Sequence, residues 1–551
     1  MTGPVRTPCD ELAIRARADA RAGAGPASGR PAPSWVLTAA ILGSSLAFID
    51  GTVVNVALPS IQRELHATVT DVQWVVEAYL LFLSALLLVG GALGDRFGRR
   101  RVFAIGVLLF TIASAACALA RDVPQLVAAR SLQGIGAALL VPGSLALIGA
   151  SFRDAERGRA IGTWSAFSAI TTALGPLVGG WLVAHSWRWA FLLNLPLGLA
   201  VLAILALRVP ESRDDEAVRL DLPGTALVTA GLGGIVYGLL EWGRAGAPAP
   251  LTLLSLALGV LSLLLFIAVE SRSAHPIVPL ALFRSRTFAG ANLLTLFLYG
   301  ALGSVFFFLP LDLIQVHGYS PAAAGAAILP FVALLGGLSR WSGSLAERIG
   351  PRIPLVIGPA LSAVGFALFA RPGTSGSYWT TFFPAVVVLG LGMSLTVAPL
   401  STTVLGAVPG HRVGVASGIN NAVARIGGLL AVALAGLLVT GTFERELDAR
   451  VPEASVGPEI RRTVLARSGQ FGALEPPASA TGPEADVIRA AVPEAFTEGF
   501  RAQAWAAALC ALLSAVAAAW LIEPLQRKRP LPKAEVVARK DSVPQVSDTR
   551  P

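Results

Sequence analysis

The sequence predicts an all-α membrane protein that crosses the bilayer fourteen times, and three observations lead to this fold class. Of 551 residues, 54% are hydrophobic and only 14% are charged, whereas soluble proteins carry nearer to a quarter charged residues. A soluble core stops growing at about 250–300 residues, so a chain this long and this apolar needs lipid around it. The apolar runs are about 20 residues long, which matches helices across a hydrocarbon layer of about 30 Å.

The expected spans follow one another with mostly short connections. No apolar signal-peptide core precedes the first span, so that span is expected to act as its own insertion signal. The spans near 189–207 and 353–370 are short, and Pro384 and Pro399 interrupt the twelfth. The fourteen spans cover residues 35–58, 72–93, 102–120, 124–151, 160–184, 189–207, 223–242, 250–269, 288–311, 322–345, 353–370, 379–407, 414–440 and 502–522.

Arginines in the short loops predict the orientation, because cytoplasmic loops carry an excess of positive charge. With an even number of spans and both termini in the cytoplasm, seventeen of these arginines lie inside and five outside. We therefore expect a multi-pass protein of the inner (plasma) membrane. The five on the outside are Arg63, Arg121, Arg188, Arg244 and Arg371.

The spans predict two six-helix halves with an additional helix pair between them. The expected parts are a disordered cytoplasmic tail (1–34), the first half (35–208), the additional pair with its linkers (209–287), the second half (288–523) and a basic cytoplasmic tail (524–551). The second half includes one long outside loop, residues 441–500.

An internal repeat supports the two halves. GALGDRFGRR at 91–100 resembles GSLAERIGPR at 343–352, and each links the second and third helix of its half. Gly91 and Gly98 permit a tight turn and close helix approach. Asp95 is placed to cap the next helix or to pair with Arg99, while Arg96 and Arg99 hold the loop at the anionic leaflet. Paired halves are typical of alternating-access carriers.

Two acids, Asp50 and Glu77, lie several residues from either end of their expected spans, where a charge is costly and a functional role is the default interpretation. Asp50 is either a functional carboxylate or a packing group paired with Asn55 or an arginine. Glu77 is either a protonatable group or cation contact, or an interfacial acid near Asp71 and Gln73.

Arg130 and Gln133 lie one helical turn apart in the fourth span. A buried arginine needs an acidic partner, and the first two spans offer one. The alternative is that Arg130 extends to the outer interface.

The fifth span carries Gly175, Pro176, Gly179 and Gly180. Proline bends a helix, and Gly175 with Gly179 forms a small-residue face for close packing. Plain helix packing explains this pattern as well as a transport role does.

Asp312 and His317 end the ninth span. They are either an outside pH-sensing pair or, as we favour, a solvated loop edge.

Several classes of function are disfavoured. The net charge is +9, and the basic residues sit in short loops between spans. This placement indicates a role in membrane topology rather than in nucleic-acid binding. Cys9, Cys117 and Cys510 have no metal or disulfide spacing, and the histidines are scattered. No GxxxxGK[ST] motif is present, so an ATP-driven pump is unexpected. We expect no enzyme activity, metal or cofactor.

Jointly, the motifs resemble the fourteen-span drug:proton antiporter family of the major facilitator superfamily, from residue 35 to 523. GALGDRFGRR is similar to the hallmark loop of that superfamily. Other matching segments are FIDGTVVNVALP (48–59), WVVEAYLL (74–81), RSLQGIGAA (130–138), WRWAFLLNLPLG (187–198), FLPLDLIQVHGYSP (308–321) and GVASGINNAVARIGG (414–428).

The sequence departs from the family pattern at Thr171, where the antiporter motif normally begins with glycine, and at Asp312, where an aromatic residue is usual. The resemblance implies the major facilitator fold, a proton-coupling role for Arg130 and an export-type motif at Gly175–Gly180. We therefore expect a proton-coupled exporter of amphipathic or cationic drugs or natural products. We further expect a monomer, with protons and membrane lipid as its other partners. Export of lipids or cell-envelope precursors, or a membrane-embedded sensor without transport, are the alternatives.

Overall fold

The computed structural model describes residues 33–152, 154–213, 221–245, 249–273, 276–409 and 412–524, and these residues form helices and loops without strands. Thirteen helical segments in these ranges are long and apolar enough to cross a membrane. The fourteenth, α14 (Arg352–Leu368), is apolar but shorter. This confirms the all-α membrane fold, while the expected tails fall almost entirely outside the described residues.

The first half and the additional pair are α2 (Pro33–Glu64), α3 (Val69–Phe97), α4 (Arg99–Leu119), α5 (Val123–Ser151), α6 (Asp154–Val183), α7 (Arg188–Leu192), α8 (Asn194–Arg208), α9 (Leu222–Ala245) and α10 (Pro250–Glu270). The second half contains η1 (Leu280–Arg284), α11 (Arg286–Leu311), the π-helical turn η2 (Asp312–Val316), α12 (Pro321–Ala326), α13 (Leu329–Ile349), α14, α15 (Tyr378–Gly406), α16 (Val413–Arg450), α17 (Pro458–Ala466), η4 (Ser468–Ala473) and α18 (Gly482–Leu521).

Local sequence signals explain where several helices begin. At the start of α3, Thr68 and Asp71 bond reciprocally to each other's backbone N–H, which satisfies two free donors of the first turn. Asp122 precedes α5 and accepts a hydrogen bond from the Gln125 N–H at 2.8 Å. Thr481 and Glu484 form a second capping box at the start of α18.

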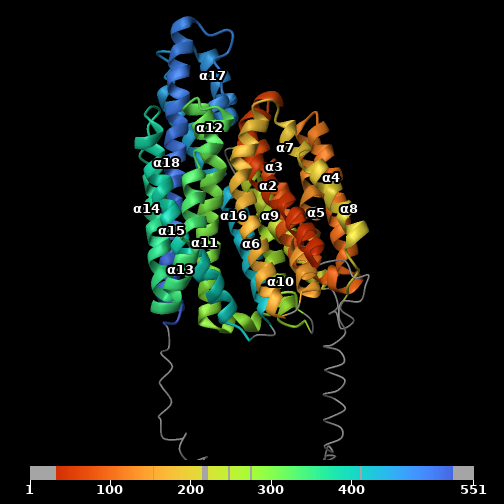
Figure 1. Cartoon of the computed structure of the whole chain (residues 1–551). Coiled ribbons are helices and arrows are strands. Elements are labelled where there is room, and N and C mark those ends of the chain that lie inside the picture. Colours follow the sequence, from red (N-terminus) through yellow and green to blue (C-terminus); the bar gives the residue numbers. More distant parts are fainter. Residues whose placement is uncertain are drawn as a thin grey trace, which may run out of the picture.

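The two halves repeat the same packing scheme (Figure 1). In the first half α2 packs on α6 and α8, and α5 packs on α3 and α4; α11 and α15 make the corresponding contacts in the second half. Helix α9 packs against α3 and α16, one helix from each half, and α10 packs on α9. Leu251, Leu258 and Leu264 of α10 are exposed, as expected for a face that meets lipid.

The long connection between the last two spans differs from the loop that the sequence suggested. Helices α16 and α18 continue well beyond the body of the molecule and form a projecting hairpin with α17 and η4 (Figure 1). Phe471, whose φ is +50°, packs its ring on Phe443 and Phe496, with centroids 4.9 and 5.8 Å away. This small aromatic core lets the segment fold, so most of 441–500 is ordered helix.

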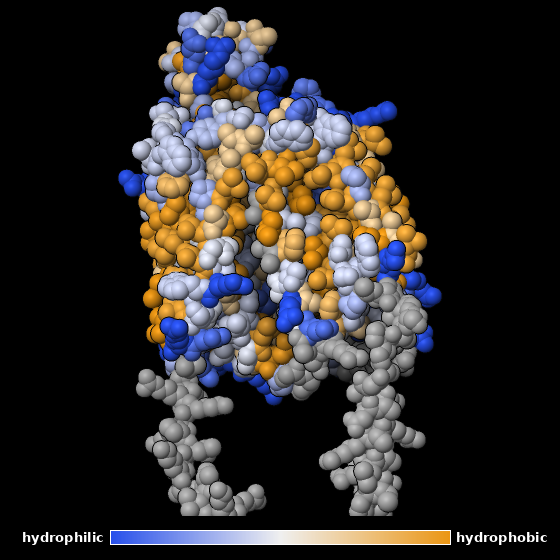
Figure 2. All heavy atoms as spheres, viewed as in Figure 1, coloured by the Kyte–Doolittle hydropathy of each residue, from blue (hydrophilic) through white to orange (hydrophobic). Residues whose placement is uncertain are grey.

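The two halves meet at the end of the molecule that carries this hairpin. A Cβ on Gly180 of α6 would overlap the backbone of α12 at Pro321 and Ala322. The Gln62 side chain donates to the Gln470 carbonyl oxygen at 2.9 Å and accepts from Gln315 at 2.8 Å, so η4 bridges the halves. Toward the opposite end, Figure 2 shows a recess between the halves, flanked on both sides by apolar surface.

Candidate functional site

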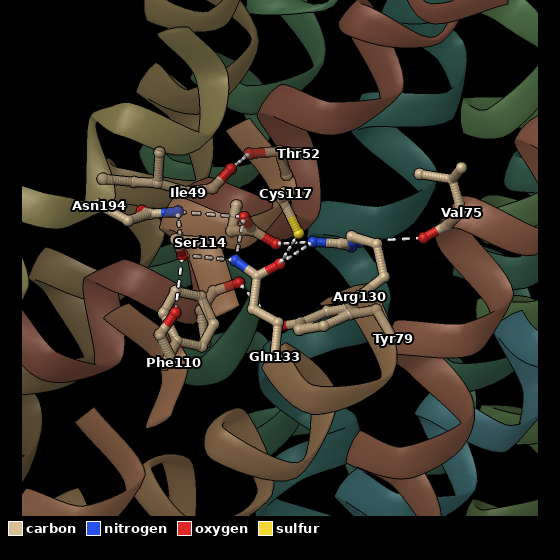
Figure 3. A network of polar contacts seen from close by, with 12 residues as sticks. Ile49, Thr52, Val75, Tyr79, Phe110, Ser114, Cys117, Arg130, Gln133 and Asn194 are labelled. Carbon is tan, nitrogen blue, oxygen red and sulfur yellow. Dashed lines mark hydrogen bonds and ion pairs between the residues drawn. The ribbon is translucent and has the colours of Figure 1, made fainter. Parts of the chain in front are cut away.

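A buried ion pair lies at the centre of the first half (Figure 3). Arg130 Nη1 donates to Asp50 Oδ2 at 2.6 Å, and the two side chains are 1% and 0% exposed. Asp50 belongs to α2 and Arg130 to α5, so the contact joins two spans. Of the sequence alternatives, the structure therefore pairs Asp50 with an arginine and excludes extension of Arg130 to an interface.

Three polar side chains complete the network around the second carboxylate oxygen. The Gln133 amide donates to Asp50 Oδ1 at 2.8 Å and to Ser114 Oγ at 2.9 Å, while its own oxygen accepts from Arg130 at 2.7 Å. Asn194 of α8 donates to Asp50 Oδ1 at 3.2 Å. Burying an ion pair is costly unless its remaining hydrogen-bonding groups are satisfied, and these contacts give both Asp50 oxygens a donor.

Close helix packing positions Arg130. A Cβ on Gly134 would meet the Tyr79 carbonyl oxygen of α3, so glycine at this position lets α5 approach α3. As a result, Arg130 Nε donates to the Val75 carbonyl oxygen at 2.9 Å, and its guanidinium lies 4.2 Å from the centre of the Tyr79 ring. The planar guanidinium thus has hydrogen bonds, a counter-charge and an aromatic face at once.

A cavity of about 250 Å³ lies beside this network, between the two halves. Helices α2, α3 and α5 form one wall, and α11 and α16 form the other. The lining is mainly apolar and includes four aromatic side chains, with Asn55, Arg130 and Arg425 as its large polar groups. The aromatic lining residues are Tyr79, Tyr299, Phe306 and Phe307.

Glu77 does not join the network. Its side chain is fully buried, and neither carboxylate oxygen has a hydrogen-bond partner among the described residues. Its α3 neighbour Trp74 packs on Tyr237 of α9, with ring centroids 6.2 Å apart. The structure therefore contradicts the alternative of a solvent-exposed interfacial acid, and Glu77 is a buried carboxyl outside the cavity lining.

The hallmark loop has the turn and the ion pair that the sequence indicated. Asp95 Oδ1 accepts from Arg99 Nε at 2.8 Å, and Gly98 has a φ of +110°, a conformation that other residues rarely adopt. The cap of α4, however, comes from Glu211 and not from Asp95. Glu211 accepts from the N–H groups of Arg100 and Arg101 at 3.0 and 3.2 Å.

The other two residues singled out in this loop, Gly91 and Arg96, have neither a close backbone approach nor an ion pair within the described residues. A Cβ on Gly91 would lie in ordinary contact with Pro142, 3.6 Å away, and the Arg96 guanidinium lies 5.4 Å from the Phe97 ring centre. In the second copy of the loop, Gly350 also has a positive φ, +88°.

The glycine motif of α6 packs in two directions. A Cβ on Gly175 or Gly179 would overlap Thr52 or Val53 of α2, which confirms the close-packing face. Gly180 instead meets α12 across the halves. The Pro176 carbonyl oxygen is the atom that a Cβ on Gly325 would overlap, so the contact is tight from both sides.

The favoured interpretation of Asp312 and His317 as a solvated loop edge is wrong. Their side chains are 2% and 4% exposed, and His317 Nε2 lies 3.6 Å from Asp312 Oδ2. The π-helical turn η2 includes Asp312 and leads to His317, whose ring packs on Phe382 with the ring centres 5.0 Å apart. Burial lowers the pKa of His317 below its usual value.

Sequence reasoning missed four residues that matter here. Ser114 and Asn194 are isolated polar groups in apolar spans, a signal that was available. Glu211 lies in a linker and is near α4 only in the folded chain. Arg425 sits within a motif already noted, but its position in the cavity follows from the packing of α16.

Comparisons with known proteins agree with this architecture. The family model described as Major Facilitator Superfamily matches residues 40–432. The puromycin resistance protein of Streptomyces alboniger is 40% identical over 80% of this chain and 89% of its own length. The tetracenomycin C resistance and export protein of Streptomyces glaucescens is 33% identical, over 90% and 92%.

A third relative, the multidrug resistance protein Stp of Mycobacterium tuberculosis, is 37% identical over 78% of this chain and 80% of its own. Among solved structures, an inward-facing bacterial homologue of the human lysosomal transporter Spinster has a TM-score of 0.63 at 19% identity, covering 88% of this chain and 97% of its own. A D-xylose–proton symporter has a TM-score of 0.55 at 15% identity, covering 89% and 98%.

Proposed function

Because this chain belongs to the Major Facilitator Superfamily, we propose that it is a multi-pass plasma-membrane transporter that exports drugs or amphipathic antibiotics in exchange for protons. The printed names of its relatives, which include puromycin resistance, tetracenomycin C export and multidrug resistance, support the class of substrate. The single observation that supports proton exchange is the fully buried Asp50–Arg130 pair beside the central cavity.

Asp50 is the proposed proton-binding group. Its partner Arg130 stays charged in proteins, so only the carboxylate of the pair can take up and release a proton. A proton on Asp50 would cancel the attraction that holds Arg130 against α2. The guanidinium would then be free to shift toward the cavity that it already lines.

The amides around Asp50 keep this site intact through the cycle. Gln133 and Asn194 donate to Oδ1, the oxygen that Arg130 leaves free. Those two bonds can persist when Oδ2 carries a proton, so the carboxyl keeps its position while its charge changes. Proton binding thereby alters one contact, the ion pair between α2 and α5.

The contacts between the halves define the conformational change. The α6–α12 contact and the Gln62–Gln470 bond close the hairpin end, whereas a recess separates the halves on one face toward the other end, so we assign the hairpin end to the outside and this conformation to the inward-open state. Transport requires the α6–α12 contact and the Gln62–Gln470 bridge to separate. Differential binding of proton and substrate to the two states would drive that exchange.

Transport in inside-out vesicles tests the proposal. Puromycin and tetracenomycin C, the compounds in the names of two relatives, are supplied outside, and uptake is measured with and without an acidic lumen. Wild-type protein should accumulate at least one compound only with the gradient.

Asp50→Asn should lose this uptake but still bind the compound in detergent, since Asn cannot carry the proton. Asp486→Asn, an exposed acid on the hairpin, is the matched control and should behave as wild type. Gradient-driven uptake by Asp50→Asn at the wild-type rate would refute the role of Asp50.

A further inference from the structure

Arg425 is a cation of the cavity without a counter-charge. It lies on α16 and lines the cavity opposite Arg130. Within the described residues it forms no ion pair and no hydrogen bond. A charge that lines a cavity between membrane-spanning helices without a counter-charge is unfavourable until a partner of opposite sign arrives.

The other charges near the cavity do not supply that partner. The charge of Arg130 is neutralised by Asp50 at 2.6 Å, so the pair contributes no net charge. No carboxylate of the described residues lines the cavity, and Glu77 contacts neither arginine. The lining therefore carries one uncompensated positive charge.

The side chains of the lining indicate which chemical class of ligand the cavity can bind. Tyr79 and Tyr299 face the cavity with Phe306 and Phe307, a set of flat apolar surfaces from both halves. Aromatic surfaces of this kind favour planar aromatic ligands. A guanidinium presents a fork of N–H donors that matches a carboxylate in two parallel hydrogen bonds.

We propose that the cavity takes planar aromatic compounds that carry a carboxylate or a similar anionic group, and that Arg425 binds the anion. This rests on the proposed export function and specifies its substrate class. It also revises the sequence-based expectation of cationic substrates, because a second positive charge in this cavity would be repelled by Arg425.

Three isosteric naphthalenes test the assignment by charge alone: 2-naphthoate, neutral 2-naphthalenemethanol and 2-naphthylmethylammonium. Binding to the detergent-purified full chain is measured by calorimetry at constant ionic strength. The expected order is naphthoate, alcohol, ammonium, with the anion at least about tenfold tighter than the cation, a typical effect of one charge contact.

Substitutions then locate the charge. Arg425→Gln should weaken naphthoate binding about tenfold while changing the affinity for the alcohol less than about threefold. Arg445→Gln is the control, because Arg445 is an exposed arginine on the hairpin end of the same helix. This control should keep the wild-type order and affinities.

Equal or reversed affinities in the wild-type protein, or no measurable naphthoate binding, would overturn the proposal even if a variant failed to fold. Wild-type naphthoate preference that survives in Arg425→Gln would overturn the role of Arg425. The binding and uptake measurements distinguish failure of the anion assignment from failure of the proposed export function. Correct binding order without gradient-driven uptake of any compound refutes export alone, whereas gradient-driven uptake with the wrong order refutes only the anion assignment.

Discussion

At the scale of single residues, the most unfavourable free-energy contributions come from a few charged side chains that are buried. The Asp50–Arg130 pair is acceptable in the membrane interior because Gln133 and Asn194 donate to the second Asp50 oxygen and the Val75 carbonyl oxygen accepts from Arg130 Nε. Removing one member of such a pair leaves the other charge buried without compensation. Glu77 shows the opposite case, since no described residue satisfies its carboxyl oxygens.

Arg130 should be sensitive to both truncation and exchange. Arg130→Ala leaves Asp50 without its cation and should cost about 3–5 kcal/mol of stability. Arg130→Lys keeps the charge but not the planar fork, so we expect partial activity. The measurements are thermal unfolding and substrate-induced proton release in detergent. An Arg130→Ala protein that exchanges protons for substrate at the wild-type rate would disprove the coupling scheme.

Glu77→Leu should stabilise the protein. Removing a buried polar group without partners is expected to gain about 1–3 kcal/mol, seen as a higher thermal midpoint. Glu77→Gln keeps two unsatisfied polar atoms and is the matched control, with little gain. Substrate affinity should not change in either variant, because Glu77 does not line the cavity. A less stable Glu77→Leu protein would show that the carboxyl has a partner in another conformation.

At the scale of elements, two contacts set how helices meet. The loop between α3 and α4 is held by Asp95–Arg99 and by Glu211, which brings the linker after α8 onto the start of α4. The contact between the halves at the hairpin end depends on Gly180 and Gly325, where backbone meets backbone. In the proposed transport cycle this second contact has to separate.

Asp95→Asn should insert normally and transport several-fold more slowly, because it removes the ion pair to Arg99. The equivalent residue in the second copy, Glu347, forms no ion pair among the described residues. Glu347→Gln is therefore the control and should stay near the wild-type rate. Expression level and initial transport rate are compared for both. Normal turnover of Asp95→Asn at normal expression would remove Asp95 from the mechanism.

Gly180→Ala should impair closure of the outer end. The new Cβ would lie 2.5 Å from the Pro321 carbonyl oxygen and 2.6 Å from Ala322 Cα, so the backbones must separate. Gly162→Ala, in the same helix, adds a Cβ with nothing within 4 Å and is the control. Transport rate should fall several-fold in the first variant only. Equal rates in the two would show that the α6–α12 contact does not limit transport.

At the scale of the whole molecule, the cavity described above lies between two repeated halves, and α9 bridges them through α3 and α16. The hairpin of α16 and α18 belongs to the second half but reaches Gln62 of the first through Gln470. The hairpin, which has no counterpart in the described part of the first half, thus lies at the end where α6 and α12 are in contact (Figure 1).

Reporter fusions test the orientation of the molecule. A fusion at residue 470 should report the outside and one at residue 540 the inside, because α18 crosses the membrane once between them. Alkaline phosphatase and green fluorescent protein give opposite signals on the two sides, which provides an internal control. The same side for both fusions would contradict an even number of spans.

The sequence by itself determined the class of protein, the spans and the repeated halves, because a bilayer forces every spanning segment to be a long apolar helix. It also marked Asp50, Arg130 and Gln133, since charges in such segments are rare. Only the tertiary structure decided which of these groups meet. Asn194 joins Asp50 across 144 positions, Glu211 caps a helix 111 positions away, and Arg425 faces a cavity that both halves build. The folded hairpin and the buried Asp312 were likewise missed, because local composition resembles a solvated loop until distant side chains pack on it. Contacts between remote segments are set by how helices pack, and the hydrophobic pattern of each helix alone does not contain that arrangement.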